Sequence, residues 1–262
     1  MDIQPLHPCF AAEVTGLDLA GPVDAATLEV LHDAFIEHAV LLFRGQHLSA
    51  GAQAEFAGRL AVLEAPLLDR RSLLLAPALR ITSGSPAGEV PLAEASWHAD
   101  HTHDAEPSLA CIAHAAGQAP LAATVTFADQ RAALDSLPPA VRHRVEELRA
   151  EHRHAGQVAQ HPVVRSHPVT GEASLFVNPG FTTRILNLPK AESDRLLATL
   201  FAAATVPRLT WTHAWMPGDL LLWDNRVVMH TGTPAAALQR TRIEGDHPLG
   251  LNAYEMPWVV AG

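Results

Sequence analysis

Residues 97–100 read Trp97-His98-Ala99-Asp100 and place an imidazole and a carboxylate two positions apart. In an extended strand, residues i and i+2 point to the same face, so His98 and Asp100 can converge on one metal ion. Completed by a second histidine, they form the facial ligand set typical of non-haem Fe(II) oxygenases. The spacing alone is weak evidence, because the chain holds 16 histidines and a strand-end histidine bonded to a neighbour would look the same. A metal site therefore requires a third ligand elsewhere.

The composition favours a small-molecule partner. The 262 residues carry a formal net charge of -10, with 28 acidic residues against 18 Lys and Arg, which argues against nucleic acid or an anionic membrane surface. The two cysteines, Cys9 and Cys111, form no CxxC, so we expect neither a disulfide framework nor structural zinc. We find no signal-peptide pattern and no apolar run of about 18 residues. We therefore expect one cytoplasmic domain over residues 1–262, with a homo-oligomer as the default.

Strands outnumber helices in the pattern. Asp24 is a candidate N-cap and predicts a helix over 25–36. Ser49 can cap a second helix that runs to about Leu60. The apolar run 38–45 predicts a strand buried on both faces. Further strands are expected at 109–113, 122–127, 173–178, 209–212 and 219–224, and a final hairpin joins 227–230 to 239–243. Because strands and helices do not alternate regularly, the pattern indicates an antiparallel barrel or double sheet with helices outside.

Two segments have competing interpretations. The basic run over 142–154 is interleaved with glutamates at helical spacing and lacks aromatics, so we interpret it as a solvated helix face and not as a nucleic-acid site. Residues 63–96 have a loose pattern rich in turn signals just before the His98 strand. This segment is either an active-site lid or an ordinary loop.

His230 is the candidate for the third ligand. It ends a strand that follows Pro217-Gly218-Asp219 and an apolar run. Farther along, Arg240 and Arg242 lie on one face of a returning strand, where a guanidinium facing an enclosed barrel requires an anion. A dicarboxylate cosubstrate would supply that anion by bidentate pairing.

At this point the chain resembles a known family, the TauD/TfdA Fe(II)- and 2-oxoglutarate-dependent dioxygenases. Weaker similarity covers residues 12–19 and 38–44, so the resemblance spans nearly the whole chain. The segments that carry it are Trp97-His98-Ala99-Asp100, Phe176-Val177-Asn178-Pro179-Gly180-Phe181-Thr182-Thr183-Arg184-Ile185, Pro217-Gly218-Asp219 through Trp223-Asp224-Asn225-Arg226 to His230, and Arg240-Thr241-Arg242-Ile243-Glu244-Gly245-Asp246-His247-Pro248.

The resemblance implies a mostly β fold with flanking helices, a double-stranded β-helix or jelly roll of cupin-like shape. It implies iron held by His98, Asp100 and His230, with 2-oxoglutarate and O2 as cosubstrates. The implied activity is hydroxylation of a small organic molecule, coupled to decarboxylation of 2-oxoglutarate to succinate. A carboxylate at Asp100 favours hydroxylation over halogenation, because related halogenases leave that position vacant for halide.

The cosubstrate residues are assigned from the same resemblance. The family's cosubstrate threonine falls on Thr124. An ungapped match places Arg240 at the second of two family arginines and Ala236 at the first, whereas a gapped match makes Arg242 the cosubstrate partner. We prefer Arg240 because the ungapped match is longer, and we keep both arginines as candidates.

The sequence says less about the identity of the substrate. The stretch after the second helix, residues 60–66, lacks the histidine that taurine-type members use for the sulfonate, which argues against taurine. Glu64, Glu94 and His101 are candidate contacts for a less anionic or amine-bearing substrate, although solvent-exposed lid residues would look the same. Two other classes compete with the dioxygenase: a 2-oxoglutarate-independent cupin-like metal enzyme, and a non-catalytic small-molecule-binding barrel.

Overall fold

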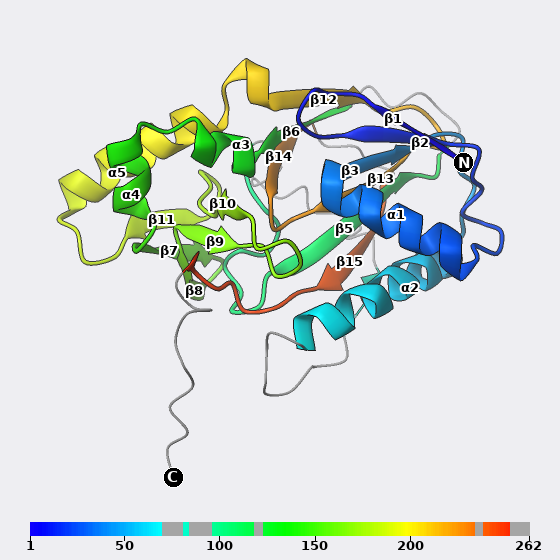
Figure 1. The fold of residues 1–262 in the computed structure, drawn as a ribbon, viewed down its shortest axis with the longest axis horizontal. Coiled ribbons are helices and arrows are strands. Elements are labelled where there is room, and N and C mark those ends of the chain that lie inside the picture. The colour runs from blue at the N-terminus through cyan, green and yellow to red at the C-terminus, as the bar shows by residue number, and fades with distance from the viewer. Residues whose placement is uncertain (70–80, 84–95, 118–122, 234–237, 252–262) are drawn as a thin grey trace, which may run out of the picture.

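The computed structural model describes residues 1–69, 81–83, 96–117, 123–233 and 238–251. Its largest element is a seven-stranded sheet (Figure 1), in which all neighbours are antiparallel except the second and third strands, which are parallel. The order across this sheet is β1 (Asp2–Pro5), β2 (Ala12–Thr15), β3 (Val40–Phe43), β13 (Leu220–Asp224), β5 (Ser108–Ala115), β15 (Leu238–Glu244) and β4 (Ile81–Ser83).

A three-stranded sheet packs against one face of the large sheet. Its order is β12 (Thr210–Ala214), β6 (Thr124–Asp129) and β14 (Val228–Gly232). Leu42 and Trp223 from the large sheet share one buried apolar cluster with Phe127 and Val228 from the small one. The two sheets therefore enclose a common core between them.

Two helices cover the other face of the large sheet, α1 (Ala25–His38) and α2 (Ala50–Asp69), which lie together in Figure 1. Leu41 and Phe43 alternate with the residues that face the small sheet and pack into the cluster beneath these helices. The predicted cap is confirmed, since Asp24 Oδ1 accepts a 2.7 Å hydrogen bond from Thr27 N. Among the helices described, none is long and apolar enough to cross a membrane.

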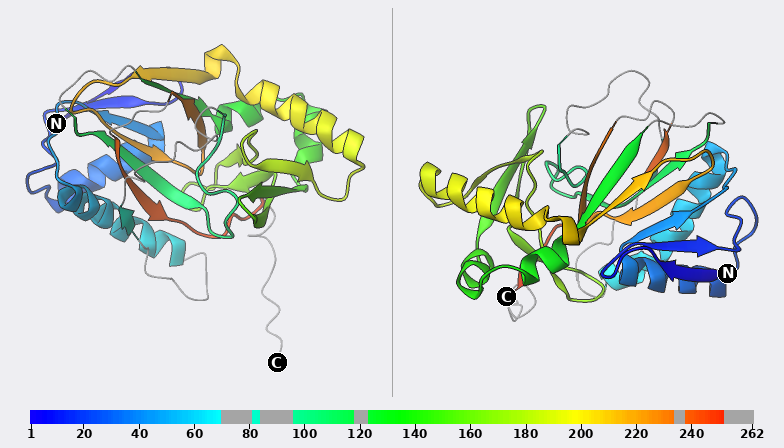
Figure 2. Two further views of the ribbon diagram at one scale, coloured as in Figure 1. Left: turned by 180° about the vertical axis from the view of Figure 1, so that it is seen from behind. Right: turned by 90° about the horizontal axis from the view of Figure 1, so that it is seen from above.

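The end of the molecule opposite α1 and α2 holds the remaining helices and strands (Figure 2). Their side chains share a third apolar cluster, which contains Leu134, Leu175 and Leu197 and also Met229 of β14. The elements are a β11-β7-β8 sheet (Thr182–Ile185, Arg149–His154, Gln157–Pro162), a β10-β9 pair (Ala173–Leu175, Val164–Ser166), α3 (Gln130–Asp135), α4 (Pro139–Val145), α5 (Lys190–Ala204) and the 3-10 turn η2 (Pro207–Leu209).

The helical interpretation of the whole basic run was wrong. Helix α4 ends at Val145, and the chain then forms strand β7, paired with β8 and β11. His152 is fully buried and Glu151 nearly so, which a solvated helix face would not allow. Charged residues at helical spacing therefore hid a strand in which two of the three buried residues, Glu151 and His152, are polar.

The predicted final hairpin was also wrong. Strand β14 pairs with β6 in the small sheet, whereas β15 pairs with β5 and β4 in the large one. The chain therefore crosses from one sheet to the other between Gly232 and Leu238. The predicted second helix ends later than Leu60, at Asp69, and the lid prediction falls mainly on residues 70–80 and 84–95, outside the described part.

Candidate metal centre and cosubstrate site

Two main-chain hydrogen bonds join the segments that carry the histidine ligands. His98 N donates to His230 O at 2.9 Å, and His230 N donates to His98 O at 2.7 Å. This antiparallel bridge places the two imidazoles side by side, with ring centroids 4.3 Å apart. The predicted strand at residues 97–100 is not formed, because His98 makes only an isolated bridge to β14 and Asp100 lies in a turn. This segment, called the metal strand below, and the middle of β14 present their histidines together.

Asp100 completes a triad of the size that a metal ion requires. Its Oδ1 lies 3.5 Å from His98 Nε2 and 3.9 Å from His230 Nε2, and one ligand atom of each residue lies within 4.8 Å of the others. Metal bonds to such atoms are about 2.0–2.2 Å long, so an ion placed between them would reach all three. Two imidazoles and one carboxylate leave open positions for cosubstrates, as in non-haem Fe(II) enzymes.

The triad sets the protonation states of the metal-free site. Burial opposes protonation of His98, but the adjacent Asp100 raises the pKa of His98 above its usual value, so a metal ion bound there would displace a proton. His98 Nδ1 lies 2.8 Å from Ser96 O and donates to it, which leaves Nε2 as the ligand atom. Burial, together with the His98 charge, lowers the pKa of His230 to about 3, so its imidazole is neutral near pH 7. Burial opposes ionisation of Asp100, but His230 and His98 hold its pKa well below the usual value.

A small cavity of about 30 Å³ adjoins the triad between the two sheets. Arg240 on β15 lines it, together with the two metal-site histidines. The cavity is otherwise mainly apolar, with Val125, Phe127, Trp215, Trp223, Thr233 and Leu238 among its lining residues. Arg240 therefore places a cationic residue in the wall of a cavity that, at about 30 Å³, has room for little more than one water molecule, so a dicarboxylate would enter only if the cavity widened.

The two candidate arginines lie in different surroundings. Arg242 Nη2 lies 3.4 Å from Asp104 Oδ2, and Arg242 is absent from the lining of the cavity that Arg240 reaches. Thr124 is also outside this lining. Its side chain is exposed, its main-chain N–H donates to Thr233 Oγ1 at 2.8 Å, and the next residue, Val125, faces the cavity.

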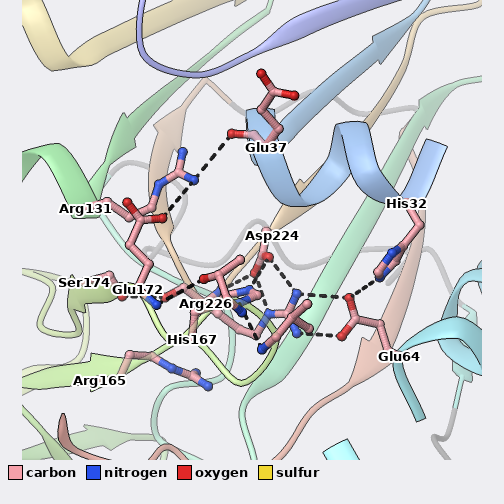
Figure 3. A network of polar contacts seen from close by, with 12 residues as sticks. His32, Glu37, Glu64, Arg131, Arg165, His167, Glu172, Ser174, Asp224 and Arg226 are labelled. Atoms are coloured by element: carbon pink, nitrogen blue, oxygen red, sulfur yellow. Dashed lines mark hydrogen bonds and ion pairs between the residues drawn. The ribbon is translucent and has the colours of Figure 1, made fainter. Parts of the chain in front are cut away.

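Glu64 lies in a buried ion-pair network with Arg226 and Asp224 (Figure 3). Only 1% of its surface is exposed, and its carboxylate accepts hydrogen bonds from Arg226 Nη1 at 2.9 Å and Arg226 Nη2 at 3.2 Å. His32 Nε2 lies 2.9 Å from the same carboxylate. The proposed contact between Glu64 and substrate is therefore withdrawn, because its buried carboxylate is already paired with Arg226 and His32. Glu94 lies outside the described residues.

His101 lies beside the triad, at the edge of an aromatic cluster that the sequence did not reveal. Its Nδ1 lies 2.9 Å from Ser108 Oγ, and its ring centroid is 6.0 Å from that of His103. Phe181 connects this cluster to the metal site, with ring centroids 4.8 Å from His103 and 5.8 Å from His98. The only advance signal was that Phe181 belongs to the segment 176–185 quoted above.

Three further residues near the triad were not predicted as site residues. Asn225 binds both main-chain polar groups of Asp100. Gly180 packs against the metal strand, where a Cβ atom would lie 3.0 Å from His98 Cβ. Burial and the adjacent Asp100 raise the pKa of the Cys111 thiol well above its usual value, so a neutral thiol lies beside the carboxylate ligand. Asn225 and Gly180 occur in the quoted segments, whereas no sequence pattern marked Cys111.

Comparison with known proteins agrees with this geometry. An (S)-phenoxypropionate/alpha-ketoglutarate-dioxygenase of Sphingobium herbicidovorans is 34% identical, with 94% of this chain and 95% of the relative covered. An alpha-ketoglutarate-dependent 2,4-dichlorophenoxyacetate dioxygenase of Cupriavidus pinatubonensis is 32% identical, with 87% and 90% covered. A taurine dioxygenase structure from Burkholderia xenovorans matches with a TM-score of 0.81 at 28% identity, covering 95% of this chain and 91% of that one.

The same relationship holds for a ligand-bound structure and for the family as a whole. The structure of AAD-2 in complex with Mn(II) and N-oxalylglycine matches with a TM-score of 0.77 at 25% identity, covering 94% of this chain and 98% of that one. Residues 2–245 match the description "Taurine catabolism dioxygenase TauD, TfdA family". The chain therefore belongs to the TauD/TfdA family of dioxygenases.

Proposed function

We propose that the protein is an Fe(II)- and 2-oxoglutarate-dependent dioxygenase that hydroxylates a small organic acid. The observation that carries this proposal is the triad of His98, Asp100 and His230 beside a cavity lined by Arg240. The first three residues would hold the metal, and the arginine would hold the far carboxylate of 2-oxoglutarate. Iron, 2-oxoglutarate and O2, when bound, supply the oxidising chemistry and yield succinate and hydroxylated product.

The residues of this chain orient the reactants and exclude water. His98 and His230 are almost completely buried, so the ligand set lies in a medium of low dielectric constant where the Arg240 charge acts strongly. Arg242 stays an alternative, and its Asp104 contact argues for a structural role. Thr124 stays a prediction for the cosubstrate site, because its exposed side chain lies next to the cavity lining and not within it.

An organic acid is the substrate class that the surroundings favour. Glu64 is bound elsewhere, so the structural support for an amine-bearing substrate falls away. On the Phe181 side of the triad, His101 and His103 offer imidazole groups, and Arg242 lies beside the same loop. The two curated relatives described above are named for aryloxy acids, which supports testing that class first.

We also propose that the overall fold is a double-stranded β-helix, or jelly roll. Strands β5 and β6, like β14 and β15, follow one another in the chain but lie in opposite sheets of a face-to-face pair. Such crossings are typical of double-sheet jelly rolls. The single domain, the lid within residues 63–96, the cytoplasmic location and the oligomeric state stay predictions.

The test is anaerobic absorption spectroscopy followed by turnover. Adding 2-oxoglutarate to the Fe(II) protein should produce a visible metal-to-ligand charge-transfer band, which a 2-oxoglutarate-independent enzyme would not give. Succinate release should then be screened with aryloxyalkanoic acids, alkyl sulfates and taurine, with the matching neutral amides as controls. A protein that binds Fe(II) but gives neither the band nor substrate-dependent succinate would contradict the proposal.

A further inference from the structure

The main chain of Asp100 is held differently from that of the two histidines. His98 and His230 are bonded to each other through their backbones. Asp100 is instead bound by one distant side chain: its N–H donates to Asn225 Oδ1 at 2.7 Å, and its carbonyl accepts from Asn225 Nδ2 at 2.8 Å. One amide therefore pairs with both main-chain polar groups of a single residue, on the two sides of its Cα atom, which fixes the direction in which the carboxylate leaves the chain.

The same amide also ties Asp100 to the large sheet. Asn225 Nδ2 donates a second hydrogen bond, of 3.0 Å, to Ser108 O at the start of β5. The Asn225 main-chain N–H donates to Leu109 O, also at 3.0 Å. Three segments, the metal strand, β5 and the turn after β13, consequently meet at one side chain that is 1% exposed.

The residues on either side of Asn225 immobilise the turn. Arg226 donates to the Asp224 carboxylate through Nε at 2.8 Å and through Nη2 at 2.7 Å, and it also binds Glu64 on α2 (Figure 3). All three groups are at most 1% exposed. None of these three residues lines the cavity beside the metal ligands, and their position around Asn225 gives them a role in holding the turn.

We propose that Asn225 is the positioning residue for the metal-binding carboxylate of Asp100, and that the Asp224–Arg226–Glu64 network holds Asn225 in place. The turn that carries Asn225 leads directly into β14, which carries His230. One short segment therefore supplies one ligand, pairs with the backbone of the second and orients the third. The inference rests on the proposed metal site and is independent of the identity of the substrate.

The test compares metal binding in Asn225→Ala with that in a matched control. Gln46 is also a buried amide, 5% exposed, whose side chain makes three hydrogen bonds to main-chain groups of Leu19, Leu17 and Arg44, far from the triad in sequence. Gln46→Ala therefore removes the same number of contacts without touching Asp100. The Kd for Mn(II) is measured by electron paramagnetic resonance on the full chain, and thermal unfolding of the metal-free proteins is measured beside it.

Asn225→Ala should weaken Mn(II) binding about 10- to 100-fold, the range for groups that orient metal ligands, while Gln46→Ala keeps the wild-type Kd. Asn225→Asp, which cannot donate to the Asp100 carbonyl, should behave like Asn225→Ala. Three outcomes would overturn the inference. They are an unchanged Kd for Mn(II) in Asn225→Ala, an equal weakening of Mn(II) binding in Gln46→Ala, and a wild-type protein that binds no Mn(II). If Asn225 variants lose metal but the wild type gives no 2-oxoglutarate band, the proposed function fails and the inference stands. If Asn225→Ala does not fold, Asn225→Asp and the Mn(II) spectrum of Asn225→Ser decide in the same way.

Discussion

Arg240 and Arg242 lie on the same strand two residues apart, yet Arg240 lines the cavity beside the metal ligands while Arg242 Nη2 lies 3.4 Å from Asp104 Oδ2. The difference arises because the two ends of β15 have different neighbours. Its first residue, Leu238, lines the cavity, whereas its last residue, Glu244, pairs with Ser108, next to the loop that contains Asp104. The alternation of a strand thus puts two like charges on one face but gives them different neighbours.

Arg240→Gln should raise the KM for 2-oxoglutarate by about 100-fold, because a charge-assisted bidentate pair contributes roughly 3 kcal/mol. Arg242→Gln is the matched control and should change this KM by less than about fivefold. The measurement is succinate formation against 2-oxoglutarate concentration, with the charge-transfer band as a second readout. The reverse order of effects would assign the cosubstrate to Arg242.

Asp100→Ala and His98→Ala should each abolish substrate-dependent succinate formation. The two protein ligands that remain would hold the metal too weakly and would no longer fix the positions at which the cosubstrates bind. Metal content after gel filtration should fall in parallel with activity. His143→Ala serves as control, since that side chain is 90% exposed and on α4. Full turnover by either triad variant would remove the metal assignment.

Gly180→Ala should weaken metal binding, because the added Cβ would lie 3.0 Å from His98 Cβ and 3.3 Å from Trp97 O. Both neighbours belong to the metal strand, so relief of this contact displaces His98. A tenfold increase in the Kd for Mn(II), about 1.4 kcal/mol, is the expected scale. Gly51→Ala is the control, since a Cβ there would come no closer than 3.8 Å to another group. An unchanged Kd for Mn(II) in Gly180→Ala would show that the segment around Trp97 can shift without displacing the His98 side chain.

Glu64→Ala should lower the free energy of unfolding by about 3–5 kcal/mol, because it leaves the buried Arg226 without one of its two carboxylates. Glu146→Ala, which removes a partly exposed partner of Arg142, should cost less than about 1 kcal/mol. Denaturant unfolding measures both. The ranking of substrates in the succinate screen should not change in Glu64→Ala, and a changed ranking would restore its substrate role.

Acid should destabilise the fold in two overlapping stages. Burial lowers the pKa of His161 to about 4 and that of His152 to about 3, from an unfolded value of 6.5. The unfolded chain therefore binds these protons first, and stability falls as the pH drops below 6.5. Burial opposes ionisation of Glu64, but Arg226 and His32 lower its pKa to about 2, so its contribution is lost between about pH 4.5 and 2. Thermal unfolding across pH 7 to 3 tests this, and a constant Tm down to pH 4 would contradict it.

The sequence was most informative where a motif has a fixed geometry. His98 and Asp100 were named from an i, i+2 spacing in a strand, and the structure brings them together although it has an isolated bridge at His98 and a turn at Asp100. His230 was found because its segment follows in family order. The signals for the strand 40–43 and for the helix after Asp24 were also local. An apolar run and a helix cap each depend only on residues that are neighbours in the sequence. Each of these features can be read without knowing the partner strands.

Features set by distant contacts were missed. Glu64 looks like any helix glutamate until Arg226, far along the chain, is placed against it. Successive residues of a strand point to opposite faces, so Val125 faces the cavity while Thr124, assigned from the family resemblance, is exposed beside it and stays a prediction. Residues 149–154 were misassigned because the polar His152 fills a buried position of β7 where apolar residues would have revealed the strand.

The backbone bridge between His98 and His230 has a consequence for the order in which the enzyme matures. These residues are joined by main-chain hydrogen bonds that do not involve the metal, so the chain can complete its fold before iron arrives. Little conformational entropy then remains to be lost when the ion binds. A chelator should accordingly remove the metal and leave a folded apoprotein, which reloads at the rate at which iron diffuses in and not at the rate at which the chain refolds.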